Sequence, residues 1–517
     1  MQLSTQLLHG GISEDPHTGA TSIPIYMAST FHQQHIGESQ WEYSRSGNPT
    51  RQAVEALVAD IEGGTAGFAF ASGSAAIATV FSMFNAGDHI VVGNDVYGGT
   101  FRLLDQVFKR LGLSFTAVDT RDLDAVTAAI TPDTKAIYLE TPTNPLLHVT
   151  DIAAIAELAH IHSLLSIIDN TFASPIVQQP LTLGVDIVLH SASKYLGGHS
   201  DVIVGVVAVK DAQLAGRIGF LQNAIGAILA PQESWLLQRG IKTLSLRMQA
   251  HQANTERLFH YLKQQPAVAK IYYPGDPDNP DYAVAKRQMH GFGAMLSFEL
   301  QPGLEPQKFV ENLHIITLAE SLGALESLIE IPALMTHGAI PRPIRIQNGI
   351  QDELIRLSVG IEDIADLEDD LTAGFTAVTS MSTLDIGVLV LMHDKQATQQ
   401  DFIDALGPGV RLHWFHPVSH PLHQPAPWLQ PLDLRQVPTL DAMIITGAPI
   451  DRLDFSAVHY YSEVTQLLDV LAAHHIPQLN VCWGAEPRYT TTLVCTKLRW
   501  NTSCSAPFVT RHWPPPP

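Results

Sequence analysis

Cysteine and positive charge are both scarce in this chain of 517 residues. The three cysteines all fall after residue 481, so no disulfide framework is expected in the long segment before them. Lysine and arginine number 30 against 51 acidic residues, and the net charge of −21 argues against nucleic acid or an anionic membrane as a partner. No apolar run reaches membrane-spanning length, and residues 1–11 are polar rather than signal-like. The expectation is a cytoplasmic enzyme of several domains.

Histidine is plentiful by contrast, with 24 copies. Four of them are closely spaced, but the prolines between them prevent one helix face from gathering the imidazoles. No metal site is therefore expected at this cluster, which consists of His413, His416, His420 and His423.

Hydrophobic patterning divides the chain into successive parts. From Phe68 to Val209 apolar strands alternate with helix-length segments, which predicts a parallel sheet covered on both faces. A long helix is predicted over Glu233 to Gln265, and a smaller α+β portion follows. Small residues from Thr372 to Thr383 are typical of a linker, and a new α/β pattern begins after them. The predicted divisions are an arm (1–60), a large domain (61–245), a small domain (246–378), a second α/β domain (379–486) and an irregular tail (487–517).

One lysine, Lys194, stands among hydroxyl and glycine residues directly after an apolar run that ends at His190. A lysine taken alone is more often a solvated surface charge. Here a strand would bring Ser191, Ser193 and Lys194 to the carboxyl edge of a sheet, where open α/β folds bind ligands. Two hydroxyls and an amine able to form a Schiff base are what pyridoxal phosphate (PLP) requires.

Three further segments would complete such a site, although each has an ordinary explanation when considered alone. Asp169 ends the apolar run 164–168 and could pair with a pyridinium nitrogen, or merely cap a turn. Gly73 and Ser74 open a helix-like run and could bind phosphate, or act as a simple helix cap. Tyr97 opens another predicted helix and could stack on a ring, or serve packing alone.

These signals occur in the order phosphate loop, tyrosine, aspartate and lysine, and the sequence segments around them are specific to one family. Residues 1 to about 378 strongly resemble the Cys/Met-metabolism family of PLP enzymes, which includes cystathionine γ-lyase, cystathionine β-lyase, cystathionine γ-synthase and methionine γ-lyase. The resemblance implies a PLP fold type I (aspartate aminotransferase-like) large domain and a small α+β domain. The matching segments are 43–51 (YSRSGNPTR), 140–145 (ETPTNP), 191–201 (SASKYLGGHSD), 321–328 (SLGALESL) and 355–363 (IRLSVGIED).

The resemblance also implies roles for single residues. Lys194 would carry the cofactor, Asp169 would hold its pyridine nitrogen and Tyr97 would stack on its ring. A homotetramer is implied, in which two phosphate ligands of each site come from a neighbouring subunit. The implied phosphate ligands are Gly73, Ser74, Ser191 and Ser193 of one subunit, with Tyr43 and Arg45 of the other. The implied substrate ligands are Arg356, Asn144 and Ser321 for the α-carboxylate, with Glu42 and Glu320 for the distal amino group of cystathionine.

The implied reaction is α,γ-elimination of cystathionine to cysteine, 2-oxobutanoate and ammonia, with Lys194 as general base and Tyr97 as acid for the leaving thiolate. Gly99 stands where methionine γ-lyases typically have cysteine, which argues against that member of the family. Leu322 stands where bacterial β-lyases often have tryptophan, which favours a γ-acting lyase. A lyase that also performs α,β-elimination, a cystathionine β-lyase, and a transferase (cystathionine γ-synthase or O-acylhomoserine sulfhydrylase) stay open.

The second α/β part resembles the N-terminal portion of homoserine O-succinyltransferases, whose fold is like class I glutamine amidotransferases. The resemblance rests on segments 391–398 (LMHDKQAT), 444–449 (IITGAP) and 482–485 (CWGA). It implies Cys482 as acyl-accepting nucleophile and Lys395 as a substrate-site residue, while His393 replaces the usual proline. Residues 487–517 lack a helical period. In that family the histidine and glutamate of the triad come far downstream of the cysteine, whereas only 35 residues follow Cys482 here. We therefore expect a gene fusion to a truncated, inactive acyltransferase, with Met381 as a former start site.

Overall fold

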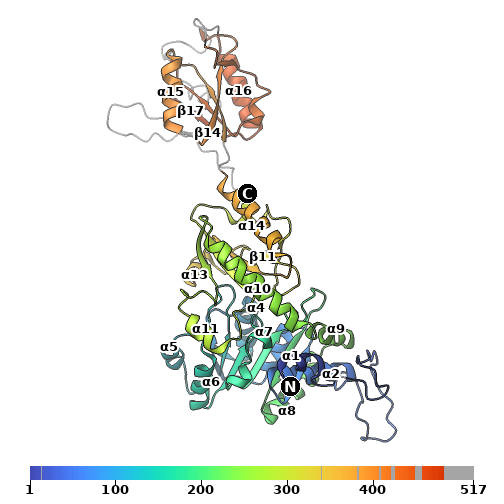
Figure 1. The fold of residues 1–517 in the computed structure, drawn as a ribbon. Helices are drawn as coiled ribbons and strands as arrows, with labels where there is room; N and C mark the ends of the chain where they lie inside the picture. Colours follow the sequence, from blue (N-terminus) through green and yellow to red (C-terminus); the bar gives the residue numbers. More distant parts are fainter. Residues whose placement is uncertain are drawn as a thin grey trace. The chain divides into compact units, whose positions relative to one another are not determined.

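The computed structural model describes residues 1–12, 14–338, 340–380, 384–406, 409–420, 426–448 and 457–481. The chain divides into two compact units, residues 1–379 (unit 1) and 380–517 (unit 2), which Figure 1 draws in sequence colours. In the described part of the chain, no helix is both long and apolar enough to cross a membrane.

Unit 1 is built on a seven-stranded sheet in the order β1-β7-β6-β5-β4-β2-β3. The expected parallel sheet is found with one exception, since β7 runs antiparallel to both of its neighbours. The connection from β6 to β7, residues 192–204, contains no crossover helix to carry the chain back across the sheet. Its strands are β1 (Ala66–Phe70), β2 (His89–Gly93), β3 (Ser114–Val118), β4 (Thr134–Glu140), β5 (Leu165–Asp169), β6 (Ile187–Ser191) and β7 (Gly205–Val209).

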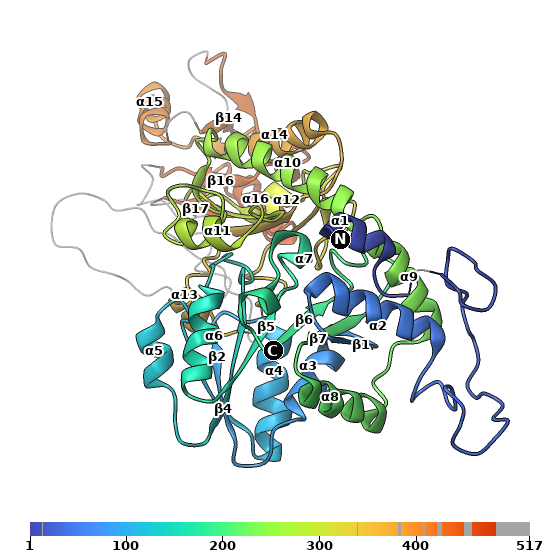
Figure 2. The same ribbon diagram turned by 60° about the horizontal axis from the view of Figure 1, so that its bottom comes forward.

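Helices cover both faces of this sheet because its central strands are apolar on both sides. On β6, Ile187 and Leu189 face one core while Val188 faces the other, as the two-residue period of a strand requires. One face is covered by α2 (Pro49–Glu62), α6 (Ile152–Ile161) and α7 (Ser174–Val177). The other is covered by α3 (Gly73–Phe81), α4 (Gly98–Leu103) and α8 (Ala212–Ile225), and both sets can be followed in Figure 2.

A five-stranded sheet in the order β10-β11-β12-β9-β8 forms the smaller α+β portion of unit 1. Its pairs are antiparallel except β10 with β11. Phe298, Phe309 and Phe375 form its aromatic centre, with the rings of Phe309 and Phe375 only 4.8 Å apart. The elements are β8 (Val268–Tyr272), β9 (Met295–Leu300), β10 (Thr317–Leu318), β11 (Leu328–Glu330), β12 (Leu354–Ser358), α12 (Pro306–Val310) and α14 (Ile364–Thr379).

The prediction of one long helix over 233–265 was wrong. The chain forms α9 (Pro231–Ile241) and α10 (Leu244–Lys263), separated by two residues. At the break, the Arg247 guanidinium reaches back to the Gly240 carbonyl at 2.8 Å and also binds the Tyr195 carbonyl at 2.7 Å. Gly240 itself packs so closely that a Cβ there would lie 2.4 Å from the Gly197 carbonyl oxygen. Tertiary contacts with the Lys194 loop therefore determine where the helix ends.

The prediction of a linker over 372–383 was wrong for its first half, because α14 continues to Thr379. The small residues serve packing: a Cβ at Gly374 would lie 2.9 Å from the Phe309 ring. Residues 381–383, with the suggested start site Met381, lie outside the described residues. The remaining helical elements of unit 1 are α1 (Leu3–His9), α5 (Leu123–Ala128), α11 (Tyr282–Gln288), α13 (Arg342–Gln347), and the short turns η1 (Leu104–Phe108), η2 (Lys109–Leu111) and η3 (Pro180–Leu183).

Unit 2 is a five-stranded, fully parallel sheet in the order β15-β14-β13-β16-β17. His413 and His416 of the histidine cluster lie on β14, where His413 Nε2 is 2.6 Å from Asp385 Oδ1. His423, Cys482 and the tail 487–517 lie outside the described residues. The elements are β13 (Leu384–Leu389), α15 (Lys395–Leu406), β14 (Val410–His416), β15 (Gln430–Pro431), η4 (Val437–Thr439), β16 (Ala442–Ile445), α16 (Tyr461–Ala473) and β17 (Gln478–Asn480).

Candidate active site

The carboxyl ends of the parallel strands of unit 1 bring chemically distinct side chains to one edge of the sheet. β4 ends at Glu140 and β5 at Asp169, and the two residues are in register as direct neighbours. β6 ends at Ser191, three residues before Lys194. β1 ends just before the turn that starts α3 at Gly73. This edge is where open α/β sheets bind ligands.

The turn before α3 is shaped for an anion. Ser72 caps the helix by accepting a hydrogen bond from the Ala75 N–H at 3.0 Å, and α3 places its N-terminal N–H groups beside Ser191. A Cβ at Gly73 would lie 2.9 Å from Ser191 Cβ, so glycine is required for this approach. Ser193 lies in the same loop and accepts a hydrogen bond from the Val204 N–H at 2.8 Å. The predicted phosphate ligands Gly73, Ser191 and Ser193 are thus gathered around the turn, with Ser74 exposed beside it.

Lys194 is largely enclosed, and its amine donates a hydrogen bond to Ser321 Oγ at 3.0 Å. Burial and the nearby Arg356 guanidinium lower the pKa of Lys194, because both disfavour a charged ammonium. Ser321 adopts a φ of 101°, in the left-handed region that non-glycine residues rarely occupy. At Gly323 a Cβ would lie 2.7 Å from the Tyr195 backbone nitrogen, so this loop packs tightly on the lysine segment.

Asp169 and Glu140 are two buried carboxyl groups on the same edge. Thr171 donates to Asp169 Oδ1 from its backbone N–H at 3.0 Å and from its hydroxyl. Burial raises the pKa of Asp169, while these hydrogen bonds and the charge of Lys194 oppose the rise. Burial and the neighbouring Asp169 charge raise the pKa of Glu140 well above its usual range. A cationic ring nitrogen next to Asp169 would complete this otherwise repulsive arrangement.

Tyr97 lies at the start of α4, where its backbone N–H donates to Glu140 Oε2 at 2.8 Å. The side chain is 44% exposed, so its ring is available to a ligand. Gly99 permits this ring position, because a Cβ on residue 99 would lie 2.3 Å from Tyr97 Cε1. The same substitution at Gly98 would meet only the Thr336 carbonyl oxygen at 3.6 Å, an ordinary contact.

Arg356 is 2% exposed and lies at the centre of a polar cluster. Its guanidinium donates to Asn144 Oδ1 at 2.9 Å and to the Ser321 carbonyl at 2.8 Å. A carboxylate on the adjacent strand, Glu330, is 3.0 Å from Nη1. The structure therefore brings together the three residues predicted to hold the substrate carboxylate, and Lys194 reaches the same Ser321.

Glu42, Tyr43 and Arg45 lie on the long loop between α1 and α2, which extends away from the rest of unit 1 in Figure 2. The Arg45 guanidinium is 5.6 Å from the centre of the Tyr43 ring, and Ser46 Oγ contacts Asn223 near the end of α8 at 3.3 Å. The structure does not bring these three residues to Lys194 within one chain. Glu320 is exposed, and its charge acts on Lys194, Glu330 and Arg356.

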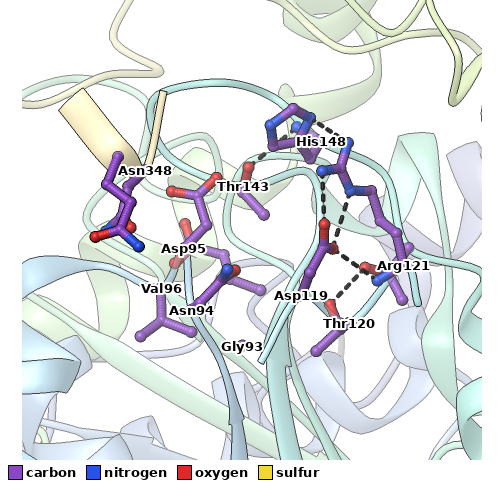
Figure 3. A pocket seen from close by; sticks show the side chains of 13 residues that line it. Gly93, Asn94, Asp95, Val96, Asp119, Thr120, Arg121, Thr143, His148 and Asn348 are labelled. Atoms are coloured by element: carbon purple, nitrogen blue, oxygen red, sulfur yellow. Dashed lines mark hydrogen bonds and ion pairs between the residues drawn. The ribbon is translucent and has the colours of Figure 1, made fainter. Parts of the chain in front are cut away.

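A cavity of about 180 Å³ opens beside Glu140, at the ends of β2, β3 and β4 (Figure 3). On one side Arg121 pairs with the Asp119 carboxylate at 2.7 Å, which offsets its charge, and donates a hydrogen bond to His148 Nδ1 at 2.8 Å. On the other side burial raises the pKa of Asp95 to about 6. Figure 3 shows the Asp95 carboxylate directed toward Thr143. The charge of Asp95, which lines this cavity, also repels the Glu140 carboxylate and contributes to the raised pKa of Glu140.

No sequence pattern pointed to Glu140 or Glu330 as site residues. Glu330 offered a signal nonetheless: a carboxylate between Ile329 and Ile331 on an apolar strand is rarely buried without a partner. Glu140 offered a weaker one, because a polar strand end in an α/β sheet is common.

The donor set fits PLP: a turn that only glycine permits, a buried carboxylate and a deprotonation-prone lysine lie on one edge of the sheet. The chain belongs to the Cys/Met metabolism PLP-dependent enzyme family, which residues 4–376 match. Residues 371–512 match the homoserine O-succinyltransferase family. The expected families, the fold class and the cofactor are thereby confirmed.

The part of this chain that matches known proteins spans almost their whole length. The crystal structure of cystathionine γ-lyase from Lactobacillus plantarum complexed with L-serine is 75% identical, with a TM-score of 0.73, over 73% of this chain and 99% of that one. Cystathionine β-lyase of Lactococcus lactis subsp. cremoris (strain MG1363) is 56% identical over 71% of this chain and 97% of its own length. Cystathionine γ-lyase of Bacillus subtilis (strain 168) is 53% identical over 72% of this chain and 98% of its own.

Proposed function

We propose that unit 1 is a PLP-dependent carbon–sulfur lyase that cleaves L-cystathionine by α,γ-elimination, with water, to cysteine, 2-oxobutanoate and ammonia. The observation that carries this proposal is the arrangement of Lys194 between Asp169, at the edge of the seven-stranded sheet, and the Arg356 cluster of the five-stranded sheet. Relatives of both lyase names support the substrate class. When bound, PLP supplies an electron sink that makes a proton on the substrate's α-carbon removable.

Each residue then has a task set by its surroundings. Arg356 binds the α-carboxylate, since a guanidinium presents two parallel N–H donors to it. Lys194 takes the α-carbon proton, and its lowered pKa makes the neutral amine available as a base. Asp169 would hold PLP by pairing with its cationic ring nitrogen. Tyr97, whose ring position requires glycine at residue 99, gives a proton to the departing sulfur.

We further propose a homotetramer in which Tyr43 and Arg45 reach the phosphate of a neighbouring subunit, with Glu42 beside the distal amino group of the substrate. The loop that carries these residues extends from the body of unit 1 and exposes large apolar side chains, with Met27 73% and Ile36 100% exposed. Exposed apolar residues on an extended loop are stabilised when a partner covers them.

A second candidate is γ-replacement on an O-acylhomoserine, as a cystathionine γ-synthase or O-acylhomoserine sulfhydrylase. The match of residues 371–512 to homoserine O-succinyltransferase favours it, because members of that family make an O-acylhomoserine.

Product analysis tests both candidates. Purified full-length protein is incubated with cystathionine alone, and 2-oxobutanoate with cysteine is the expected result. Pyruvate with homocysteine would instead establish α,β-elimination. Formation of cystathionine from O-succinylhomoserine and cysteine, without cleavage of cystathionine, would refute the lyase proposal in favour of the transferase. Lys194→Ala should abolish every one of these reactions.

A further inference from the structure

Arg356 already has a carboxylate partner inside the protein. Glu330 stands directly opposite Arg356 in the antiparallel pairing of β11 with β12. Their side chains are 0% and 3% exposed, and Glu330 Oε1 is 3.0 Å from Arg356 Nη1. Thr336 Oγ1 donates to the same Glu330 oxygen at 2.8 Å. The register of the two strands thus places the two side chains opposite each other.

The guanidinium nevertheless keeps one N–H without a partner among the described residues. Nη1 serves Asn144 and Glu330, and one N–H of Nη2 serves Ser321. Nε is buried with no hydrogen-bond partner in the described part of the chain. Nε and Nη2 share one edge of the planar fork, the geometry that a carboxylate uses for bidentate binding. A substrate carboxylate can therefore bind Arg356 without displacing Glu330.

Such binding places two carboxylates against one buried cation. Burial raises the pKa of Glu330 while Arg356 and the Thr336 hydrogen bond oppose that rise, and a second anion on Arg356 removes part of this opposition. Glu330 Oε2 is buried and unpartnered in the described part, so a proton can reside there without breaking the Thr336 contact. The other charged or titratable groups around this pair are Lys194, Glu320, Glu140, Tyr195 and His337.

We propose that Glu330 is a positioning residue which holds Arg356 in the free enzyme and takes up a proton when an amino-acid carboxylate binds. The inference rests on the proposed binding role of Arg356. Two consequences follow. Glu330 keeps the Arg356 guanidinium in place before binding, and the affinity of the enzyme for an amino-acid carboxylate declines as the pH rises. The proton comes from solvent and no bond other than the O–H on Glu330 is formed.

Calorimetry with L-alanine tests this without turnover, because alanine has no leaving group at its β-carbon. Titrations of the holoenzyme at about pH 8.5 in two buffers of different ionisation enthalpy give the number of protons taken up per alanine bound. The wild type should take up more protons per alanine bound than Glu330→Gln, which keeps the side-chain shape and the Thr336 contact but cannot be protonated. The variant should also bind alanine about tenfold more tightly at that pH.

Two controls make the result specific. L-alaninamide lacks the carboxylate, so its binding should show no difference in proton uptake between wild type and Glu330→Gln. Glu326→Gln makes the same chemical change at an exposed position of the same segment and should behave as wild type. Equal proton uptake for alanine in wild type and Glu330→Gln would overturn the proposal. The proposal would also be overturned if the wild-type affinities for alanine and for alaninamide showed the same dependence on pH between about 6.5 and 9. Cystathionine cleavage enters none of these measurements, so a failure of the lyase proposal remains distinguishable.

Discussion

Replacement of Arg356 by methionine would leave Glu330 buried without its counter-ion, and the cost can be worked from the structure. Both side chains are almost wholly buried, and the removal of one partner from a buried ion pair typically costs about 3–5 kcal/mol. Glu330 can escape this cost only by taking up a proton. From an ordinary pKa near ~4.3, neutralisation of a carboxyl group at pH 7 costs about 3.7 kcal/mol. Both routes therefore predict a loss of about 3–4 kcal/mol for Arg356→Met at neutral pH.

The pH dependence of this loss follows from the direction of the pKa. In Arg356→Met the folded-state pKa of Glu330 lies above its unfolded value, because burial is no longer opposed by the guanidinium. Stability from the protonated carboxyl is complete below the unfolded pKa and is lost as the pH rises through the folded pKa. The deficit relative to wild type should thus shrink by about 1.4 kcal/mol for each pH unit between about 7 and 5.

Urea unfolding of the full chain, followed by the cofactor's visible circular dichroism, reports on unit 1 alone. We expect the midpoint of Arg356→Met to approach that of wild type as the pH is lowered to 5. The double variant Arg356→Met/Glu330→Gln should recover most of the stability at pH 7, because it removes the unpaired charge. An equal deficit at both pH values, or no recovery in the double variant, would refute the reasoning.

Three further predictions concern other parts of the chain. Gly99→Ala should displace the Tyr97 ring, since the added Cβ would lie 2.3 Å from Cε1. This displacement should lower kcat/KM for cystathionine by about tenfold or more. The control Gly98→Ala, whose added Cβ has its nearest contact at 3.6 Å, should retain wild-type kinetics. Burial lowers the pKa of both His251 and His337 to about 4, so stability should decrease as the pH falls from about 6.5 to 4. His251→Gln should flatten that part of the urea-midpoint profile, and an unchanged slope would contradict the assignment. Deletion of residues 381–517 should leave cystathionine turnover unchanged, because Lys194, Asp169 and Arg356 all lie in unit 1. A large loss of kcat would show that unit 2 contributes.

Much of the site could be predicted because its residues lie next to strand ends or in distinctive local segments. Lys194, Asp169 and Gly73 each follow an apolar run, and parallel strands bring such positions to one edge. The arm residues Tyr43 and Arg45 stay predictions, since their proposed partners belong to another chain. The extent of α14 and the break between α9 and α10 were missed, because small residues that pack closely have the same composition as a linker, and a break caused by a distant loop leaves no local signal.

Local segments of specific composition were enough to indicate the family, the cofactor and the order of the chemical groups along the chain. Which of these groups act on one another depends on the folded arrangement of distant segments. Glu330 and Arg356 are 26 residues apart in the sequence and become partners through the register of two strands. Likewise the lowering of the Lys194 pKa depends on burial and on Arg356, neither of which is a property of the segment around Lys194. Local motifs can be recognised from neighbouring residues, whereas electrostatic interactions depend on the distance between charges in the folded protein.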